Sequence, residues 1–230
     1  MNEIKHNYLY LIWKDPYSRR NYIVGKLTRN EKNYEFEYYG EYKNALTKGW
    51  KLMNAFPEEK VYTSDRLFAA FTGRLPDPKR KGINDILKKY GLSEYDGYEL
   101  LKNSTGRLPI DTYEFIDPIF PEDEEIVRDF YIMGIRHHGD CKGVHCDKIK
   151  NLFAGTELTL VQEPENEYDP YAVKVVTREG TMLGYIPRYY SMSVTQRLSK
   201  GMTYSCNVIE AKNDGNCENC IKVRLKMPRE

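Results

Sequence analysis

Residues 163–173 read EPENEYDPYAV and residues 184–188 read GYIPR, and both stretches interrupt a series of short apolar runs. The first stretch contains two prolines, which fix the backbone and cannot donate to a sheet, so we expect an extended excursion between two strands. Asn166 and Asp169 have short polar side chains that bond to nearby backbone amides within turns. The pattern therefore predicts two strands joined by a structured loop that carries several polar groups.

Short runs of apolar residues lie on both sides of this loop. Their length and even spacing are typical of a small barrel or sandwich, with one short helix over 191–198. The strands are expected over 131–135, 157–162, 172–177, 183–186, 204–210 and 221–225.

The first half of the chain changes its hydrophobic period along its length. Alternation in the first forty residues predicts a three-stranded antiparallel meander. Helical spacing follows, with Ser64 expected to cap a helix over 67–71 and Asp96 expected to cap a later one. A further helix over 83–90 and a returning strand over 112–116 complete an α+β domain. The meander strands are expected over 8–12, 22–27 and 34–38.

Residues 117–125, DPIFPEDEE, combine two prolines with an acidic run. Proline disfavours regular structure and like charges stay solvated, so this composition is typical of a linker. We therefore expect an α+β domain over 1–117, an acidic, proline-containing linker over 118–127, and a small mostly-β barrel with a short helix over 128–230.

Composition excludes several classes of protein. The 230 residues include 35 Lys and Arg against 34 Asp and Glu, and a net charge of +1 excludes a protein that coats nucleic acid by bulk electrostatics. No apolar run approaches the roughly 20 residues of a membrane span, and the first residues lack a signal-peptide pattern. Five cysteines are an odd number, so a disulfide framework is not expected. We expect a cytoplasmic protein without a membrane partner.

The second half resembles the HIRAN domain over Phe130 to Met227. The resemblance rests on three segments in the same order and spacing, namely GIRHHG at 134–139, EPENEYDPYAV at 163–173 and GYIPR at 184–188. HIRAN domains are OB-like barrels that, in their best-known members, bind the 3′ end of single-stranded DNA. The resemblance therefore implies an OB-like fold and a single-stranded DNA 3′ end as partner.

Residue roles follow from the resemblance by position. It implies that Asp169 accepts the terminal 3′-hydroxyl, that Tyr168 stacks on the last base, and that Asn166 and Arg136 hold phosphate oxygens. The other implied DNA-binding residues are His137, His138, Tyr185 and Arg188. The two histidines stand where the best-known member has tyrosines, and a neutral imidazole can also stack. From the residues alone an alternative stays open, in which Asn166 and Asp169 bond only to their own loop backbone.

The first half resembles the N-terminal domain of HipA-type kinases. The kinase lobes have no room in this chain, and neither a phosphate-cradling glycine-rich loop nor a catalytic aspartate motif appears in the sequence. The resemblance implies a noncatalytic piece, which in split systems is a separate antitoxin that docks on a kinase toxin. It covers residues 8–117 and rests on 22–27, 36–38, 67–71, 75–77, 100–101 and 106–109.

Three functions follow as hypotheses. The leading one is a noncatalytic DNA-binding adaptor, not an enzyme, whose second half binds DNA ends and whose first half docks a protein partner such as a HipA-like kinase. The first alternative is an antitoxin-like protein that neutralises such a kinase. The second is a metal-dependent enzyme that processes DNA ends, using carboxylates to bind a divalent ion.

Four cysteines in two predicted loops are candidate ligands for a metal ion. Cys141, Cys146, Cys217 and Cys220 form two pairs that could supply the four ligands of a structural zinc. The default expectation is that these thiols are unpaired and that the protein holds no metal and no cofactor.

Overall fold

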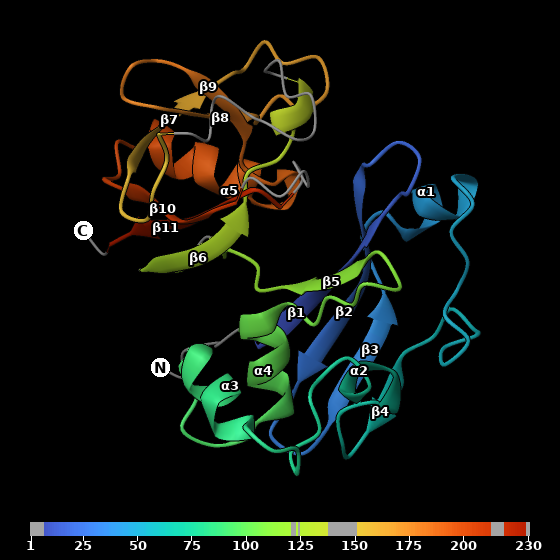
Figure 1. Cartoon of the computed structure of the whole chain (residues 1–230). Coiled ribbons are helices and arrows are strands. Elements are labelled where there is room, and N and C mark those ends of the chain that lie inside the picture. The colour runs from blue at the N-terminus through green and yellow to red at the C-terminus, as the bar shows by residue number, and fades with distance from the viewer. Residues whose placement is uncertain (1–6, 121–122, 124, 138–150, 213–218, 229–230) are drawn as a thin grey trace, which may run out of the picture. The chain divides into compact units, whose positions relative to one another are not determined.

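The computed structural model describes residues 7–120, 123, 125–137, 151–212 and 219–228 (Figure 1). The chain divides into two compact units, Met1–Pro118 and Ile119–Glu230. No helix among the described residues is long and apolar enough to cross a membrane.

The first unit is built on an antiparallel sheet of five strands in the order β4-β3-β2-β1-β5 (Figure 1). The predicted meander forms its centre, and the returning strand is the edge strand β5. Its strands are β1 (Tyr8–Lys14), β2 (Asn21–Arg29), β3 (Tyr34–Tyr38), β4 (Tyr62–Ser64) and β5 (Tyr113–Ile116). Its helices are α1 (Tyr42–Thr47), α2 (Ala69–Thr72), α3 (Ile83–Lys89) and α4 (Gly97–Ser104).

One face of this sheet forms the core of the unit, because alternate residues of the strands are apolar. Leu9, Val24 and Phe36 from three neighbouring strands are buried to within 1% of complete burial. Phe71 of α2 and Leu101 of α4 belong to the same cluster. These two helices therefore cover the apolar face, as the helical spacing predicts.

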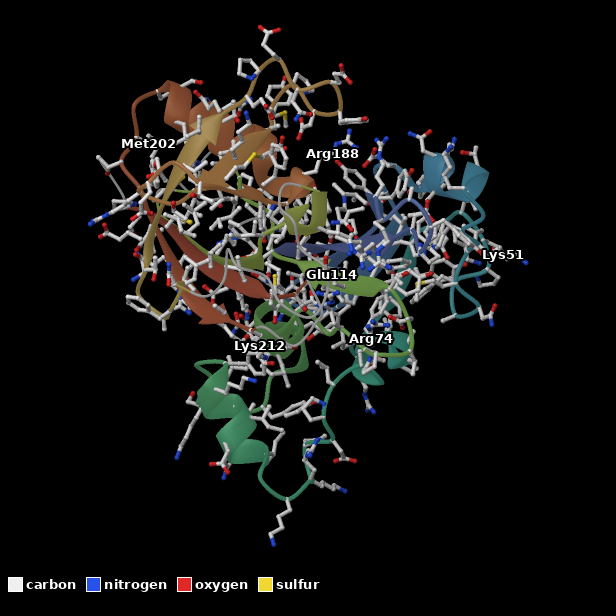
Figure 2. All side chains as sticks on the ribbon, turned by 45° about the horizontal axis from the view of Figure 1, so that its top comes forward. Lys51, Arg74, Glu114, Arg188, Met202 and Lys212 are labelled. Carbon is white, nitrogen blue, oxygen red and sulfur yellow. The ribbon has the colours of Figure 1, made fainter. Side chains whose placement is uncertain are left out.

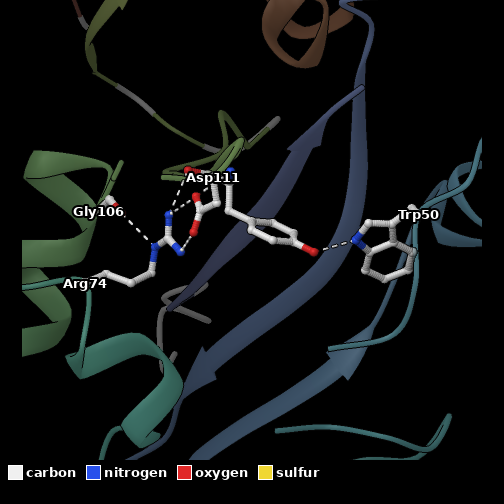
Figure 3. A network of polar contacts seen from close by, with 5 residues as sticks. Trp50, Arg74, Gly106 and Asp111 are labelled. Carbon is white, nitrogen blue, oxygen red and sulfur yellow. Dashed lines mark hydrogen bonds and ion pairs between the residues drawn. The ribbon is translucent and has the colours of Figure 1, made fainter. Parts of the chain in front are cut away.

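A buried ion pair fastens α2 to the approach of β5 (Figure 3). The two Nη atoms of Arg74 donate to the two carboxylate oxygens of Asp111 at 2.7 and 2.8 Å, and Nε donates to the carbonyl of Gly106 at 2.7 Å. The side chain of Arg74 is 6% exposed. Tyr113 extends the network, because its carbonyl accepts from Arg74 and its hydroxyl accepts from the indole of Trp50 at 2.6 Å.

One expectation for the first unit is wrong, and one helix of this unit was not expected. Ser64 does not cap a helix. It ends strand β4, and α2 begins at Ala69 after Phe68, without a side-chain cap. Helix α1 was not expected, because Glu41 at its start makes no capping hydrogen bond and the helix has a single buried residue, Ala45. By contrast, Asp96 caps α4 as predicted and accepts from two backbone amides.

The second unit is a six-stranded sheet in the order β6-β11-β10-β7-β8-β9, and α5 is the one long helix among its described residues (Figure 1). The predicted fold class, an α+β domain followed by a small mostly-β domain with a short helix, is confirmed. The elements are β6 (Ile126–Tyr131), the 3₁₀ turn η1 (Ile135–His137), β7 (Glu157–Gln162), β8 (Val173–Val176), β9 (Met182–Tyr185), α5 (Arg188–Ser199), β10 (Ser205–Ala211) and β11 (Ile221–Met227).

The two ends of this sheet meet, so the sheet curls into a barrel. Met133 lies two residues beyond β6 and pairs with Tyr185 of β9 through two backbone hydrogen bonds of 2.8 and 2.9 Å. Gly184 makes this approach possible. A Cβ atom there would collide with the carbonyl oxygen of Met133 and would lie 2.8 Å from Cγ2 of Ile132.

The first strand of the barrel lies earlier than expected, so the predicted strand over 131–135 is wrong. The chain pairs from Ile126 to Tyr131, and Gly134 then takes a φ of +75°, which ends the extended segment before η1. Alternation in this region is weak, because a charged pair interrupts it. The buried positions Ile126 and Phe130 nevertheless define the strand.

Part of the expected linker packs into the second unit. Ile119 and Phe120 are 6% and 9% exposed. Helix α5 binds their carbonyls, because the hydroxyl of Ser193 donates to Ile119 at 3.1 Å and the guanidinium of Arg197 donates to Phe120 at 2.7 Å. Ile119 and Phe120 are therefore not solvated as residues of a flexible linker would be.

We expect Gly184→Ala to lower the free energy of unfolding of the second unit by about 2–3 kcal/mol, because the added methyl group pushes the closing strands apart. Urea unfolding followed by circular dichroism measures this. Tryptophan fluorescence reports the first unit separately, since both tryptophans, Trp13 and Trp50, lie there.

Gly180→Ala is the matched control. A Cβ at Gly180 meets no atom within 4 Å, although its φ is +83°. It should cost only about 1 kcal/mol of left-handed backbone strain. Equal losses in the two variants would show that barrel closure does not depend on Gly184.

Candidate nucleic-acid interface

The loop between β7 and β8 is folded by one asparagine. The carboxamide oxygen of Asn166 accepts from the backbone amides of Tyr168 and Asp169 at 3.0 and 3.1 Å. The backbone amide of Glu163 donates to the carbonyl of Ala172 at 2.8 Å and closes the base of the loop. The side-chain oxygen of Asn166 thus takes the place of a backbone acceptor, as expected for asparagine in a turn.

Glu163 is the centre of the polar contacts on one side of this loop. Its Oε2 atom accepts from the Tyr185 hydroxyl and from the Asn166 amide, both at 2.8 Å. Its Oε1 atom forms an ion pair with Lys174 of β8. The network joins the loop to two strands of the barrel.

These contacts change how two groups titrate. The hydrogen bonds from Lys174 and Asn166 lower the pKa of Glu163 to about 2. Burial and the hydrogen bond to Glu163 raise the pKa of Tyr185 to about 12. Near neutral pH the network therefore holds a carboxylate, an ammonium and a neutral phenol, and the two charges offset each other.

Asp169 lies on the other side of the loop and is tied to helix α5. Its Oδ2 atom accepts from the hydroxyl of Ser191 at 2.6 Å, and its Oδ1 atom accepts from the backbone amide of Tyr171 at 3.0 Å. The side chain is partly exposed. A carboxylate offers about four acceptor sites, so Asp169 keeps capacity for a ligand hydroxyl.

Two exposed tyrosines flank this carboxylate in the sequence, and two exposed arginines lie elsewhere in the unit. Tyr168 is 87% exposed, and Tyr171 is 41% exposed. Arg188 is the first residue of α5 and is exposed, as labelled in Figure 2. Arg136 in η1 is exposed as well. The unit thus offers rings and guanidinium groups to solvent, which are the groups that bind bases and phosphates.

The predicted site residues differ in how much of each side chain is exposed and in which hydrogen bonds it makes. Asn166 and Tyr185 have polar atoms engaged within the protein, whereas Tyr168, Arg136 and Arg188 are exposed. The backbone of His137 lies in η1, without a described side chain, and His138 lies outside the described residues. Sequence reasoning considered Glu163 only as a carboxylate that could bind a divalent ion, and it assigned no role to Lys174 or Ser191. The alternation of β8 was a signal for Lys174, because it places Lys174 opposite Tyr185 of β9.

Three of the four cysteines considered as zinc ligands lie outside the described residues. Cys141, Cys146 and Cys217 are not described, and Cys220 is 2% exposed. Burial raises the pKa of the remaining thiol, Cys206, to about 12. Among the described residues no three His, Cys, Asp or Glu side chains are grouped as metal ligands.

Two family models match the chain. The HIRAN domain model matches residues 127–227, and the HipA N-terminal domain model matches residues 19–109. The resemblance of each half is therefore confirmed: the chain carries a HipA N-terminal domain followed by a HIRAN domain.

Two solved structures are similar to the chain. A crystal structure of a Lactobacillus plantarum protein is 20% identical with a TM-score of 0.36 and covers 46% of this chain and 99% of that one. The crystal structure of the HIRAN domain of human HLTF is 14% identical with a TM-score of 0.34 and covers 46% of this chain and 80% of that one. No curated protein matches the chain.

The Glu163 network makes a prediction about pH. Since the pKa of about 2 in the folded state lies below the ordinary value of about 4.3, the network stabilises the second unit above about pH 4 and loses this contribution as the pH falls toward 2. Lys174→Met should move the carboxyl pKa of Glu163 back toward about 4, measured by carbon-13 NMR titration. Lys200→Met is the control, because Lys200 is exposed and lies just beyond the last residue of α5. An unchanged pKa in Lys174→Met would contradict the assigned ion pair.

Proposed function

We propose that this protein is a noncatalytic DNA-binding adaptor. Its HIRAN domain binds the 3′ end of single-stranded DNA, and its HipA N-terminal domain docks a protein partner. The observation that carries the first part is the carboxylate of Asp169, which is fixed by two hydrogen bonds and still has room to accept a third.

The chemistry of Asp169 suits a free 3′-hydroxyl. A carboxylate accepts a hydrogen bond from a hydroxyl group and repels a phosphate at short range. Ser191 and the amide of Tyr171 hold the carboxylate in one orientation, so no ordering of this side chain is required when the strand binds. A strand that ends in a hydroxyl is therefore preferred over one that ends in a phosphate.

The exposed residues supply the remaining contacts. The ring of Tyr168 can stack on the last base, and such stacking does not depend on base identity. The guanidinium groups of Arg136 and Arg188 suit phosphate oxygens, which they can bind in a bidentate manner. Asn166 and Tyr185 in addition position the loop through Glu163.

Fluorescence polarisation with short labelled single strands tests this function. Wild-type protein should prefer a 3′-hydroxyl over a 3′-phosphate, and Asp169→Asn should reduce that preference because an amide does not repel phosphate. Tyr168→Ala should weaken binding by about 1–3 kcal/mol through the lost stacking contact.

Two variants serve as controls for this experiment. Glu165→Gln changes an exposed carboxylate of the same loop, and Tyr17→Ala removes a ring that is 91% exposed in the other unit. Neither should alter binding. A wild-type protein that ignores the chemistry of the 3′ end would overturn the proposal.

A second candidate function follows from the HipA N-terminal match over residues 19–109. We infer that this domain acts on a separate kinase. In this role the protein is antitoxin-like and neutralises a HipA-type kinase.

Size-exclusion chromatography tests this docking. The full chain mixed with a HipA-type kinase that lacks its own N-terminal domain should elute as one complex and reduce kinase autophosphorylation. Separate elution at micromolar concentrations, with kinase activity unchanged, would count against the antitoxin-like role and leave the DNA-binding role untouched.

A further inference from the structure

We propose that a cluster of cations around helix α3 is a second nucleic-acid contact, which binds backbone phosphates of the DNA whose 3′ end occupies the HIRAN domain. This inference rests on the proposed function. We call this surface the α3 basic cluster, and it consists of Lys79, Arg80, Lys81, Lys88 and Lys89.

The local fold presents these side chains to solvent. Asp77 shapes the loop before α3, because its carboxylate accepts from the backbone amide of Lys79 at 2.7 Å and its carbonyl accepts from that of Arg80 at 3.0 Å. Leu87, which is 5% exposed, anchors the opposite side of the helix. All five cationic residues of the cluster are exposed. The ammonium of Lys89 lies 5.5 Å from the ring centre of its neighbour Tyr90.

The charge of the cluster is not balanced locally. Residues 77–91 contain five cations and two acidic residues, Asp77 and Asp85, whereas the whole chain carries a net charge of only +1. Across the described part of the chain, no ion pair involves any member of the α3 basic cluster.

The surroundings of the cluster favour a polyanion over a protein partner. Within α3, Leu87 is buried and Ile83 and Ile86 are half-buried, so the fully exposed residues of the helix are polar or charged. Protein interfaces usually have an apolar centre within a polar rim. Binding to a phosphate backbone needs no apolar centre, because the release of counterions supplies the free energy.

The cluster suits a flexible polyanion. Lys88 and Lys89 lie in the last turn of α3, and Lys79, Arg80 and Lys81 lie in the loop before it. The long, flexible side chains can adjust to each phosphate, which gives affinity without sequence preference.

The experiment compares the full chain with a variant in which all five residues of the α3 basic cluster are changed to glutamine. Two labelled single strands share one 3′ end, one of about 5 and one of about 30 nucleotides, and their affinities are measured over a range of salt concentrations. We expect the variant to bind the long strand at least about 10-fold more weakly at low salt, with a salt slope reduced by about 2. Its affinity for the short strand and its preference for a 3′-hydroxyl should be unchanged.

A matched control removes the same charge from other exposed positions of the first unit. These are Lys32, Lys43, Lys48, Lys51 and Arg66, of which Lys51 is labelled in Figure 2. The inference is overturned if this control weakens long-strand binding as much as the cluster variant does, or if the cluster variant binds the long strand like wild type. Failure of the proposed function has a different signature, namely no preference for the 3′-hydroxyl on either strand.

Discussion

The curl of the sheet in the second unit depends on one pair of backbone hydrogen bonds, between Met133 and Tyr185, which brings the two ends of the sheet together. Glycine at 184 lets the two segments approach, and the same pairing fixes the direction of the Tyr185 side chain. Its hydroxyl then reaches Glu163, which in turn receives the amide of Asn166. The shape of the loop that carries the candidate site therefore depends on the pairing of Met133 with Tyr185.

This arrangement separates residues that build the site from residues that meet a ligand. The ion pair of Glu163 with Lys174 offsets two charges close to the loop, so it adds little net charge to the surface. Asp169 is held by Ser191 and can act on a ligand as an isolated carboxylate. Under the proposed function, this site selects by the chemistry of a strand's end, and a near-neutral protein needs no long basic groove for that purpose.

Much of the fold could be predicted from the sequence, because alternation and turn residues coincide at most strands. Prediction failed where local signals were missing or misleading, as at α1, which has no side-chain cap, and at β6, where the charged pair Arg128 and Asp129 interrupts the alternation. The loop motif indicated Asn166 and Asp169, but sequence could not decide which of their atoms bond within the protein. The role of Ser191 could not be predicted from the sequence, since its contact with Asp169 joins residues far apart along the chain.

Amide spectra of the nitrogen-15-labelled full chain, recorded during titration with a short single strand that has a free 3′-hydroxyl, test the central claim most directly. If Asp169 receives the terminal hydroxyl, the largest shifts fall on the amides of Tyr168, Asp169, Tyr171 and Ser191, and they disappear when the strand ends in a phosphate. Shifts of equal size with both strands, or shifts confined to other parts of the chain, would contradict a site that binds DNA ends.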